Sequence, residues 1–339
     1  MRKLLNTLYI TTPNSYISKD GLNVVISVEG SEVFRIPAIN IEGIVTFGYM
    51  GVSPGLMRLC VENGISISFL SPSGKFVSRV VGPKMGNVLL RKKQCQLTDD
   101  DQFAVHLCKL FIMGKIQNYR SILQRYLRDY GQNESVAAIA SDLKRSIFKV
   151  SNSNTIDSIR GIEGDAAKNY FSVFPNLITQ QKDFFTFHGR TKHPPKDCVN
   201  ALLSFAYTLI GHEMASALES VGLDPYIGFL HTLRPGRCSL ALDMMEELRA
   251  YMGDRFVLSL INRRQLSPND FKCHENSVIL NENGRKKFIT AWQARKQETL
   301  EHPYLKEKIK VGLIPYVQAT LLARYFRKEI DDYPVFIIK

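Results

Sequence analysis

The sequence predicts an α+β protein with two domains, a small N-terminal β-sheet domain and a larger all-helical C-terminal domain. The length of 339 residues fits two domains, since domains typically hold about 100–200 residues. Hydrophobic residues make up 45% of the chain, enough to bury a sizeable core. The pattern of residues changes near residue 85. We therefore expect a β domain over 1–84, a linker over 85–98 and a helical domain over 99–339.

Short runs rich in Val, Ile, Phe and Thr fill the N-terminal part. Turns with glycine at 19–21 and 29–31 suit hairpins, because glycine accepts the positive φ of tight turns. Ser53-Pro54 is an N-cap signal followed by proline at the first helical position, and Gly64 suits the end of that helix. The expected strands are 8–11, 23–28, 32–36, 41–47, 65–70 and 76–81.

Beyond residues 82–87, whose glycine and proline predict a linker, the apolar period lengthens to that of helices. The Pro194-Pro195 pair and the Asp224-Pro225 step interrupt the helical pattern. The expected helices are 100–129, 133–148, 156–173, 196–221, 238–251, 285–300 and 305–330.

The net charge of +12 favours a polyanionic partner such as nucleic acid, although ordinary soluble proteins also reach such values. No run is long and apolar enough to cross a bilayer, and the N-terminus is a poor signal peptide. The six cysteines form no C-x-x-C pair and no zinc-spaced cluster with histidine. This pattern predicts reduced thiols in a cytoplasmic protein without structural zinc or membrane contact.

Two places in the helical region are candidates for chemistry. Glu163 lies in Arg160-Gly161-Ile162-Glu163-Gly164, where glycines let another chain approach, but a lone glutamate is more often a helix surface residue. His231 follows an apolar lead-in and precedes a turn that carries Arg234 and Arg237. Such a histidine is often a core side chain. The guanidinium groups, however, match phosphate oxygens in pairs, so both arginines are candidate phosphate contacts.

A third place is the predicted helix after His231. Asp243 and Glu246 are three residues apart and share a face among apolar neighbours. Burying carboxylates is costly without a cation, so this pattern suggests a cation site; the alternative is an amphipathic helix with its acids in water. On the helix 100–129, Lys115, Arg120 and Arg125 are candidate contacts for a DNA backbone or a solvated basic face.

The glutamate motif, the later histidine with its arginine-bearing turn, and the acidic helix together resemble the CRISPR-associated spacer-acquisition integrases. These are the catalytic subunits of the CRISPR adaptation complex, an antiviral defence system. The resemblance covers nearly the whole chain, and the segment 317–325 is similar to versions of subtype I-C. It implies that the helical domain is catalytic and the β domain dimerises, which would also cover exposed sheet edges.

Carried onto this sequence, the resemblance implies Glu163, His231 and Glu246 as catalytic metal ligands for Mg²⁺ or Mn²⁺. Many relatives have aspartate where this chain has Glu246, so Asp243 remains an alternative third ligand or a supporting acid. Asn200 matches a supporting position.

The implied reaction is attack by the 3′-hydroxyl of a short DNA duplex on a phosphodiester of CRISPR repeat DNA. The implied partners are DNA, a second copy of the chain in a homodimer, and a small ferredoxin-like adaptation protein. Two other functions remain open. One is a metal-dependent DNA nuclease with a repair-type role that uses water as nucleophile. The other is a DNA-binding protein without catalysis.

Overall fold

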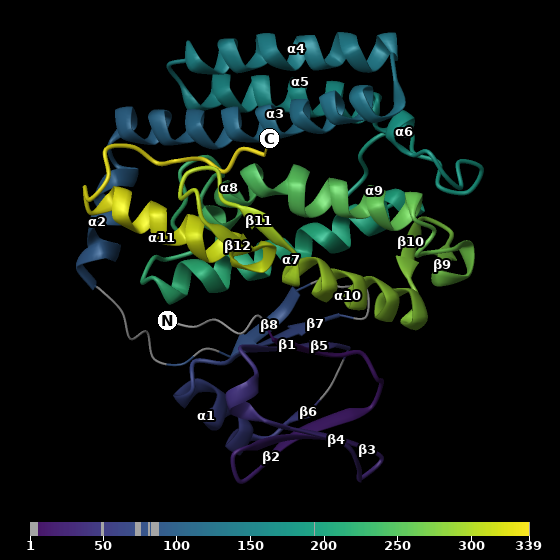
Figure 1. The fold of residues 1–339 in the computed structure, drawn as a ribbon. Coiled ribbons are helices and arrows are strands. Elements are labelled where there is room, and N and C mark those ends of the chain that lie inside the picture. The colour runs from purple at the N-terminus through teal and green to yellow at the C-terminus, as the bar shows by residue number, and fades with distance from the viewer. Residues whose placement is uncertain are drawn as a thin grey trace. The chain divides into compact units, whose positions relative to one another are not determined.

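The computed structural model describes residues 6–48, 51–71, 76–80, 82, 88–192 and 194–338. The chain forms two compact units, Met1–Met85 with Leu280–Glu298, and Gly86–Ile279 with Thr299–Lys339. The N-terminal region is β-rich and the C-terminal region is largely helical, which confirms the predicted fold class (Figure 1). The unit boundaries differ from the expected ones because helix α10 (Glu282–Gln297) belongs to the first unit. Helix α2 (Val88–Thr98) lies within the range expected as linker, and 83–87 lie outside the described residues.

The described residues of the first unit form two four-stranded sheets with the strand orders β1-β5-β7-β8 and β4-β3-β2-β6. In the first sheet β1, β5 and β7 are parallel and β8 is antiparallel. In the second, β2, β3 and β4 are antiparallel and β6 is parallel to β2. The strands are β1 (Thr7–Ile10), β2 (Ser15–Asp20), β3 (Asn23–Val28), β4 (Ser31–Pro37), β5 (Gly43–Phe47), β6 (Gly51–Val52), β7 (Ser66–Leu70) and β8 (Phe76–Val80).

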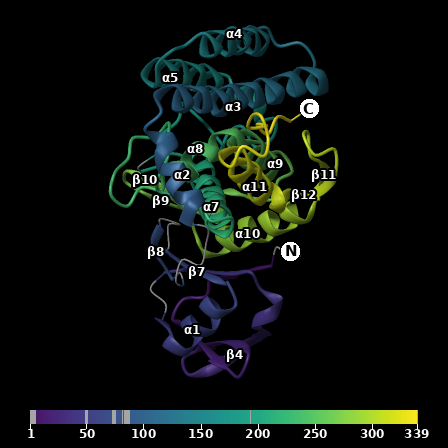
Figure 2. The same cartoon turned by 90° about the vertical axis from the view of Figure 1, so that its left-hand side faces the viewer.

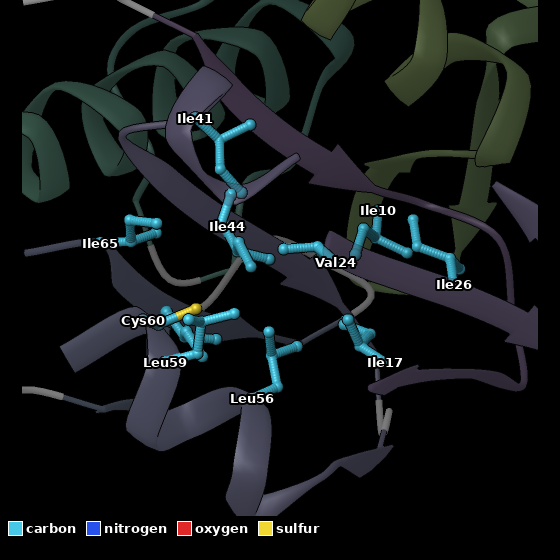
Figure 3. Close-up of a cluster of buried hydrophobic side chains, with 12 residues drawn as sticks. Ile10, Ile17, Val24, Ile26, Ile41, Ile44, Leu56, Leu59, Cys60 and Ile65 are labelled. Atoms are coloured by element: carbon cyan, nitrogen blue, oxygen red, sulfur yellow. The ribbon is translucent and has the colours of Figure 1, made fainter. Parts of the chain in front are cut away.

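Side chains from both sheets and from helix α1 (Pro54–Glu62) form one buried apolar cluster in this unit (Figure 3). Ile17 comes from β2, Ile44 from β5 and Leu56 from α1, and each is at most 1% exposed. The predicted start of α1 is confirmed, because the Ser53 hydroxyl accepts a hydrogen bond from the Leu56 N–H at 3.2 Å.

The second unit is built on the long helix α3 (Asp101–Tyr130), which lies beside α4 (Glu134–Ser151) and α5 (Ile156–Ser172) in both views (Figures 1 and 2). Side-chain caps begin all three helices, and Gly131 ends α3 at φ +89°. Buried residues recur along the face of α3 that packs on these neighbours and on α8. The α3 helix is therefore the element on which α4, α5 and α8 pack.

Of the remaining elements of this unit, α8 and the segment that follows it pack directly on α3. Helix α8 ends at Leu248 and continues as a π-helical segment, Arg249–Asp254, before α9 begins. π-Helical turns are rare and often mark functional positions. The elements are α6 (Phe174–Leu177), α7 (Cys198–Ser220), α8 (Ser239–Leu248), α9 (Arg255–Asn262), β9 (Phe271–His274), β10 (Ser277–Leu280), β11 (Thr299–Glu301), β12 (Lys308–Lys310) and α11 (Ile314–Phe326).

The C-terminal residues 331–338 run along α3. Asn118 on α3 donates to the Phe336 carbonyl at 2.8 Å and accepts from the Ile338 N–H at 2.9 Å. The buried carboxylate of Glu247 on α8 accepts from the Phe336 N–H at 2.6 Å. These contacts tie α3, α8 and the C-terminal residues together. None of the described helices is both long and apolar enough to cross a membrane.

Candidate active site

Three helices bring one lysine and two carboxylates together. The Lys115 ammonium on α3 forms an ion pair with Glu163 on α5 and lies 2.6 Å from Glu246 Oε2 on α8. The Lys115 and Glu246 side chains are only 3% and 4% exposed, whereas Glu163 is 27% exposed. Glu163 therefore stands at the open side of the cluster.

The second oxygen of Glu246 faces two other groups. Arg249, one turn along the chain, places Nη2 2.9 Å from Glu246 Oε1, and His231 Nε2 lies 3.8 Å from the same oxygen. Burial raises the pKa of Glu246, but the charges of Arg249 and Lys115 outweigh it and hold the pKa at about 2. Glu246 is therefore ionised at neutral pH.

Asp243 fixes the orientation of His231. Asp243 Oδ1 lies 2.6 Å from His231 Nδ1 and also accepts the His231 backbone N–H at 2.9 Å. Asp243 Oδ2 accepts the backbone N–H groups of Phe229 and Leu230 at 2.6 and 3.0 Å. A carboxylate that accepts backbone N–H groups on both oxygens only accepts hydrogen bonds, so His231 Nδ1 donates to Asp243 and Nε2 is the ring nitrogen that faces Glu246.

Two further residues hold the loop before His231 in place. Arg160, on the same helix as Glu163, donates from Nε and Nη2 to the Leu230 carbonyl at 2.8 and 2.6 Å. Gly228 lies so close to α8 that an added Cβ would be 2.6 Å from the Ser239 carbonyl carbon and 2.7 Å from Asp243 Oδ2. Only glycine fits this approach of the loop to the helix.

Behind Arg249 lies a buried network centred on Tyr207 of α7. The guanidinium groups of Arg190 and Arg249 lie 5.3 and 5.0 Å from the centre of its ring. The Tyr207 hydroxyl donates to Asp254 at the end of the π-helical segment. Burial raises the pKa of Asp254 to about 6, against the lowering effect of the Tyr207 hydrogen bond.

Asn200, expected as a supporting residue, is fully buried on α7. Its side-chain oxygen accepts from Arg190 Nη1 at 2.8 Å and from the Thr191 N–H at 2.9 Å, and its amide donates to the Gly189 carbonyl at 2.8 Å. Asn200 thus holds the loop that carries Arg190.

A cavity of about 690 Å³ opens beside Glu163 within this unit. Its wall combines aromatic side chains such as Phe171 and Phe187 with a surplus of positive charge. Gly164, which follows Glu163 and lines the cavity, has nothing within 4 Å of the position of a Cβ, so it leaves this side open. The cations that line the cavity are Lys115, Lys168, Arg190, Lys192 and Arg249.

The structure brings Glu163, His231 and Glu246 into one cluster, and it places Asp243 behind His231, away from the cluster's open side. Lys115, expected to face DNA, is paired with the two glutamates instead of standing on an open helix face.

The other expected phosphate-binding arginines lie outside the cluster. Arg125 is about 15 Å along α3 from Lys115, given a rise of about 1.5 Å per residue, and it pairs with Asp129 at 3.2 Å. Arg120 is half-buried on the same helix, Arg234 is exposed and Arg237 is half-buried.

Sequence reasoning missed three functional candidates: Arg160, Arg190 and Arg249. Arg160 stands inside the glutamate motif, and Arg249 follows Glu246 by one helical turn, so both positions carried a local signal. Arg190 lies in a loop without such a pattern, and only the fold reveals its contact with Tyr207.

Within the residues that the structure describes, no three His, Cys, Asp or Glu side chains form a ready metal-binding group. In the cluster, the Lys115 ammonium contacts the carboxylates of both Glu163 and Glu246.

Comparison with known proteins places the chain in a family. The sequence profile described as CRISPR associated protein Cas1 matches residues 8–294. The chain belongs to the Cas1 family. The CRISPR-associated endonuclease Cas1 1 of Chlorobaculum tepidum is 48% identical, with 99% of each chain covered. The CRISPR-associated endonuclease Cas1 2 of Rhodospirillum rubrum is 46% identical over the full length of both chains. The chain is thus an enzyme of the Cas1 endonuclease family.

Solved structures show the same fold. A Cas1 protein from Thermotoga maritima superposes with a TM-score of 0.84 at 21% identity, covering 98% of this chain and 100% of that one. A casposase bound to its integration product gives a TM-score of 0.84 at 22% identity, covering 96% and 92%. The Cas1 fold therefore spans both the β-rich and the helical region.

Proposed function

We propose that this Cas1 enzyme inserts short DNA fragments into a CRISPR array, with Glu163, His231 and Glu246 as the ligands of a divalent cation. The 3′-hydroxyl of a fragment attacks a phosphodiester of the repeat DNA, so that a new phosphodiester joins the fragment to the repeat and the cleaved repeat strand leaves with a free 3′-hydroxyl. One observation carries the proposal: residues from three distant segments meet where a carboxylate pair, an imidazole nitrogen and a basic cavity adjoin.

The donor set fits a divalent cation. Asp243 holds His231 Nδ1 as a donor, which is how metal-bound histidines are usually oriented by a carboxylate behind them. Glu246 Oε2 has no well-directed hydrogen bond although Lys115 is near, so it retains coordinating capacity. Carboxylate oxygens suit Mg²⁺, and one imidazole shifts the preference towards Mn²⁺. A bound cation would polarise the scissile phosphate and stabilise its developing negative charge.

Asp243 supports this site without being a ligand in the proposal. Its two oxygens already accept three backbone N–H groups and the His231 ring, so ligation would break several of these bonds. Glu246, whose longer side chain reaches Lys115 and Arg249, is the third ligand in the proposal.

The cavity beside Glu163 would receive the DNA strand. Its lining cations can neutralise phosphates, and its aromatic rings suit stacking of bases. Arg249 pairs with Glu246 at 2.9 Å and shares the Tyr207 ring with Arg190, and we assign these two arginines the phosphates close to the reacting bond. Arg120, Arg125, Arg234 and Arg237 would hold more distant stretches of the backbone.

We also propose the assembly implied by the sequence resemblance. Val33 and Phe34 on the edge strand β4 are 58% and 45% exposed, which supports dimerisation through the β-rich region. A solved Cas6-RT-Cas1–Cas2 complex contains a chain of the same fold, with a TM-score of 0.83 at 21% identity. A small ferredoxin-like adaptation protein is thus the proposed partner, in the cytoplasm. The segment 317–325 supports subtype I-C.

The test is a strand-transfer assay with a labelled short duplex, a supercoiled plasmid carrying the repeat, the companion protein and Mn²⁺. Glu163→Ala and His231→Ala should abolish the joined product. Asp165→Ala is the matched control, because Asp165 is an exposed carboxylate on the same helix and should retain activity. Cleaved ends without joined product would indicate the nuclease alternative, and joining that persists without a divalent cation would refute the proposed chemistry.

A further inference from the structure

Lys115 occupies an unusual place for a lysine. It sits in the middle of α3, its side chain is only 3% exposed, and its ammonium contacts a carboxylate from each of two other helices. A buried lysine is costly unless it is paired, and here the pairing uses the two carboxylates that the proposed function assigns to the cation. The same oxygens therefore have two possible cationic partners.

We propose that the Lys115 ammonium occupies the cation site before a divalent ion binds. In that state it holds Glu163 and Glu246 together. When the ion arrives, the Lys115 side chain withdraws into the adjoining cavity. This inference rests on the proposed function, since it takes these two glutamates as ligands. It adds that the ion must displace a residue of the chain itself.

Charge balance supports the exchange. Glu163, Glu246 and Asp243 carry three negative charges, while Lys115 and Arg249 carry two positive ones. The cluster is thus nearly neutral as it stands. Adding a divalent ion without moving Lys115 would bring three cationic groups around two glutamates. Withdrawal of the ammonium by a few ångströms returns the cluster to neutrality.

The structure also provides room for the withdrawal. Lys115 lines the cavity of about 690 Å³ beside Glu163, so its side chain can turn into open space without moving a helix. In that cavity the ammonium would meet the phosphates of a bound DNA strand. Ion binding would thereby release a cation for the substrate, which couples the two binding events.

Displacement has a measurable cost in affinity. If the ion binds only to molecules in which Lys115 has withdrawn, its apparent affinity is its intrinsic affinity multiplied by the fraction of molecules in that state. If the ion pair is formed in about 90–99% of molecules, removal of the ammonium should tighten binding about 10- to 100-fold. A purely structural ion pair predicts the opposite, because its loss would let the glutamates move apart and weaken the site.

The test is calorimetric titration of metal-free protein with Mn²⁺, comparing wild type, Lys115→Met and Lys168→Met. Lys168 is an exposed lysine lining the same cavity, so its variant loses the same charge without touching the glutamates. We expect Mn²⁺ to bind Lys115→Met at least about 10-fold more tightly than wild type, and Lys168→Met to bind like wild type. Unchanged or weaker binding by Lys115→Met would overturn the inference, as would equal tightening by Lys168→Met.

If Lys115→Met is too unstable without metal for calorimetric titration, thermal unfolding with and without Mn²⁺ provides the test instead. In EDTA we expect its melting temperature to fall below that of wild type, since the glutamates then repel each other, and Mn²⁺ should raise it more than in wild type. Lys115→Gln, whose amide still donates to a carboxylate, serves as the milder variant and should show the same order. Absence of a larger Mn²⁺ effect in both variants contradicts the inference.

The outcomes also separate the two proposals. Absence of Mn²⁺ binding in wild type and in Lys115→Met removes the cation site itself. Binding by wild type that Glu163→Ala abolishes, without tightening in Lys115→Met, leaves the proposed function intact and refutes only the role of Lys115.

Discussion

Replacing Asp243 by asparagine tests how the site is organised. The carboxylate accepts backbone N–H groups on both oxygens, whereas an amide accepts on one side only. The better orientation keeps the amide oxygen towards Phe229 and Leu230 and turns the NH₂ group to His231. The His231 backbone N–H then loses its acceptor, at a cost of about 1–3 kcal/mol.

The same orientation changes the histidine. With an NH₂ group facing it, Nδ1 must accept, so the ring proton lies on Nε2, which then cannot bind a cation. We expect Asp243→Asn to lower the free energy of unfolding by about 1–3 kcal/mol. We also expect Mn²⁺ affinity to fall by about 10- to 100-fold, as for other residues behind a metal-bound histidine.

Urea unfolding and Mn²⁺ calorimetry measure the two effects separately. Asp142→Asn is the control, since Asp142 pairs with Arg145 on the surface of α4 and its loss should change neither quantity appreciably. Wild-type Mn²⁺ affinity in Asp243→Asn would refute the reasoning that this carboxylate sets the tautomer of His231.

Three further predictions concern the surroundings of the site. Gly114→Ala should lower the free energy of unfolding by about 1–3 kcal/mol, because the added methyl overlaps Val335 in the C-terminal residues. Gly161→Ala is the control and should not lower it, since nothing lies within 4 Å of the added methyl. Equal effects of the two substitutions in urea unfolding would contradict this prediction. Folding raises the pKa of Asp254 from 3.8 to about 6, so the folded state holds this proton more tightly than the unfolded state. The free energy of unfolding of the wild type, minus that of Asp254→Asn, should therefore fall as pH rises from 3.8 to about 6. A difference that stays flat or rises with pH in denaturation experiments would refute this prediction. Arg160→Ala should lower the free energy of unfolding by about 1–3 kcal/mol and slow strand transfer, because the loop before His231 loses two charged hydrogen bonds. Strand transfer at the wild-type rate would show that these hydrogen bonds are not needed to position the loop.

Local signals were enough to predict much of the fold. Ser53 caps its helix and Gly64 adopts φ +68° after it, as their positions in the sequence indicate. The strand Ser15–Asp20 was missed because Ser, Lys and Asp dominate it, and its buried face carries the polar Ser15 beside the apolar Ile17. The long apolar helices were predicted for the opposite reason, since their period is sustained over many residues.

The site was predictable in its residue types and less so in its contacts. Asp243 and Glu246 share a helix face, so spacing alone does not tell which one faces the loop before His231 and which one faces α3. The position of Lys115 depends on how α3 packs on α5, across 48 residues of sequence. Such tertiary contacts have no local pattern from which they could be inferred.

Pulsed electron paramagnetic resonance of bound Mn²⁺ tests the central claim most directly, because it detects a nitrogen ligand of the ion. We predict nitrogen coupling in wild type, its loss in His231→Ala, and its retention in His188→Ala, an exposed histidine that lines the same cavity. Absence of the coupling in wild type, or its persistence in His231→Ala, would contradict a cation site built on Glu163, His231 and Glu246.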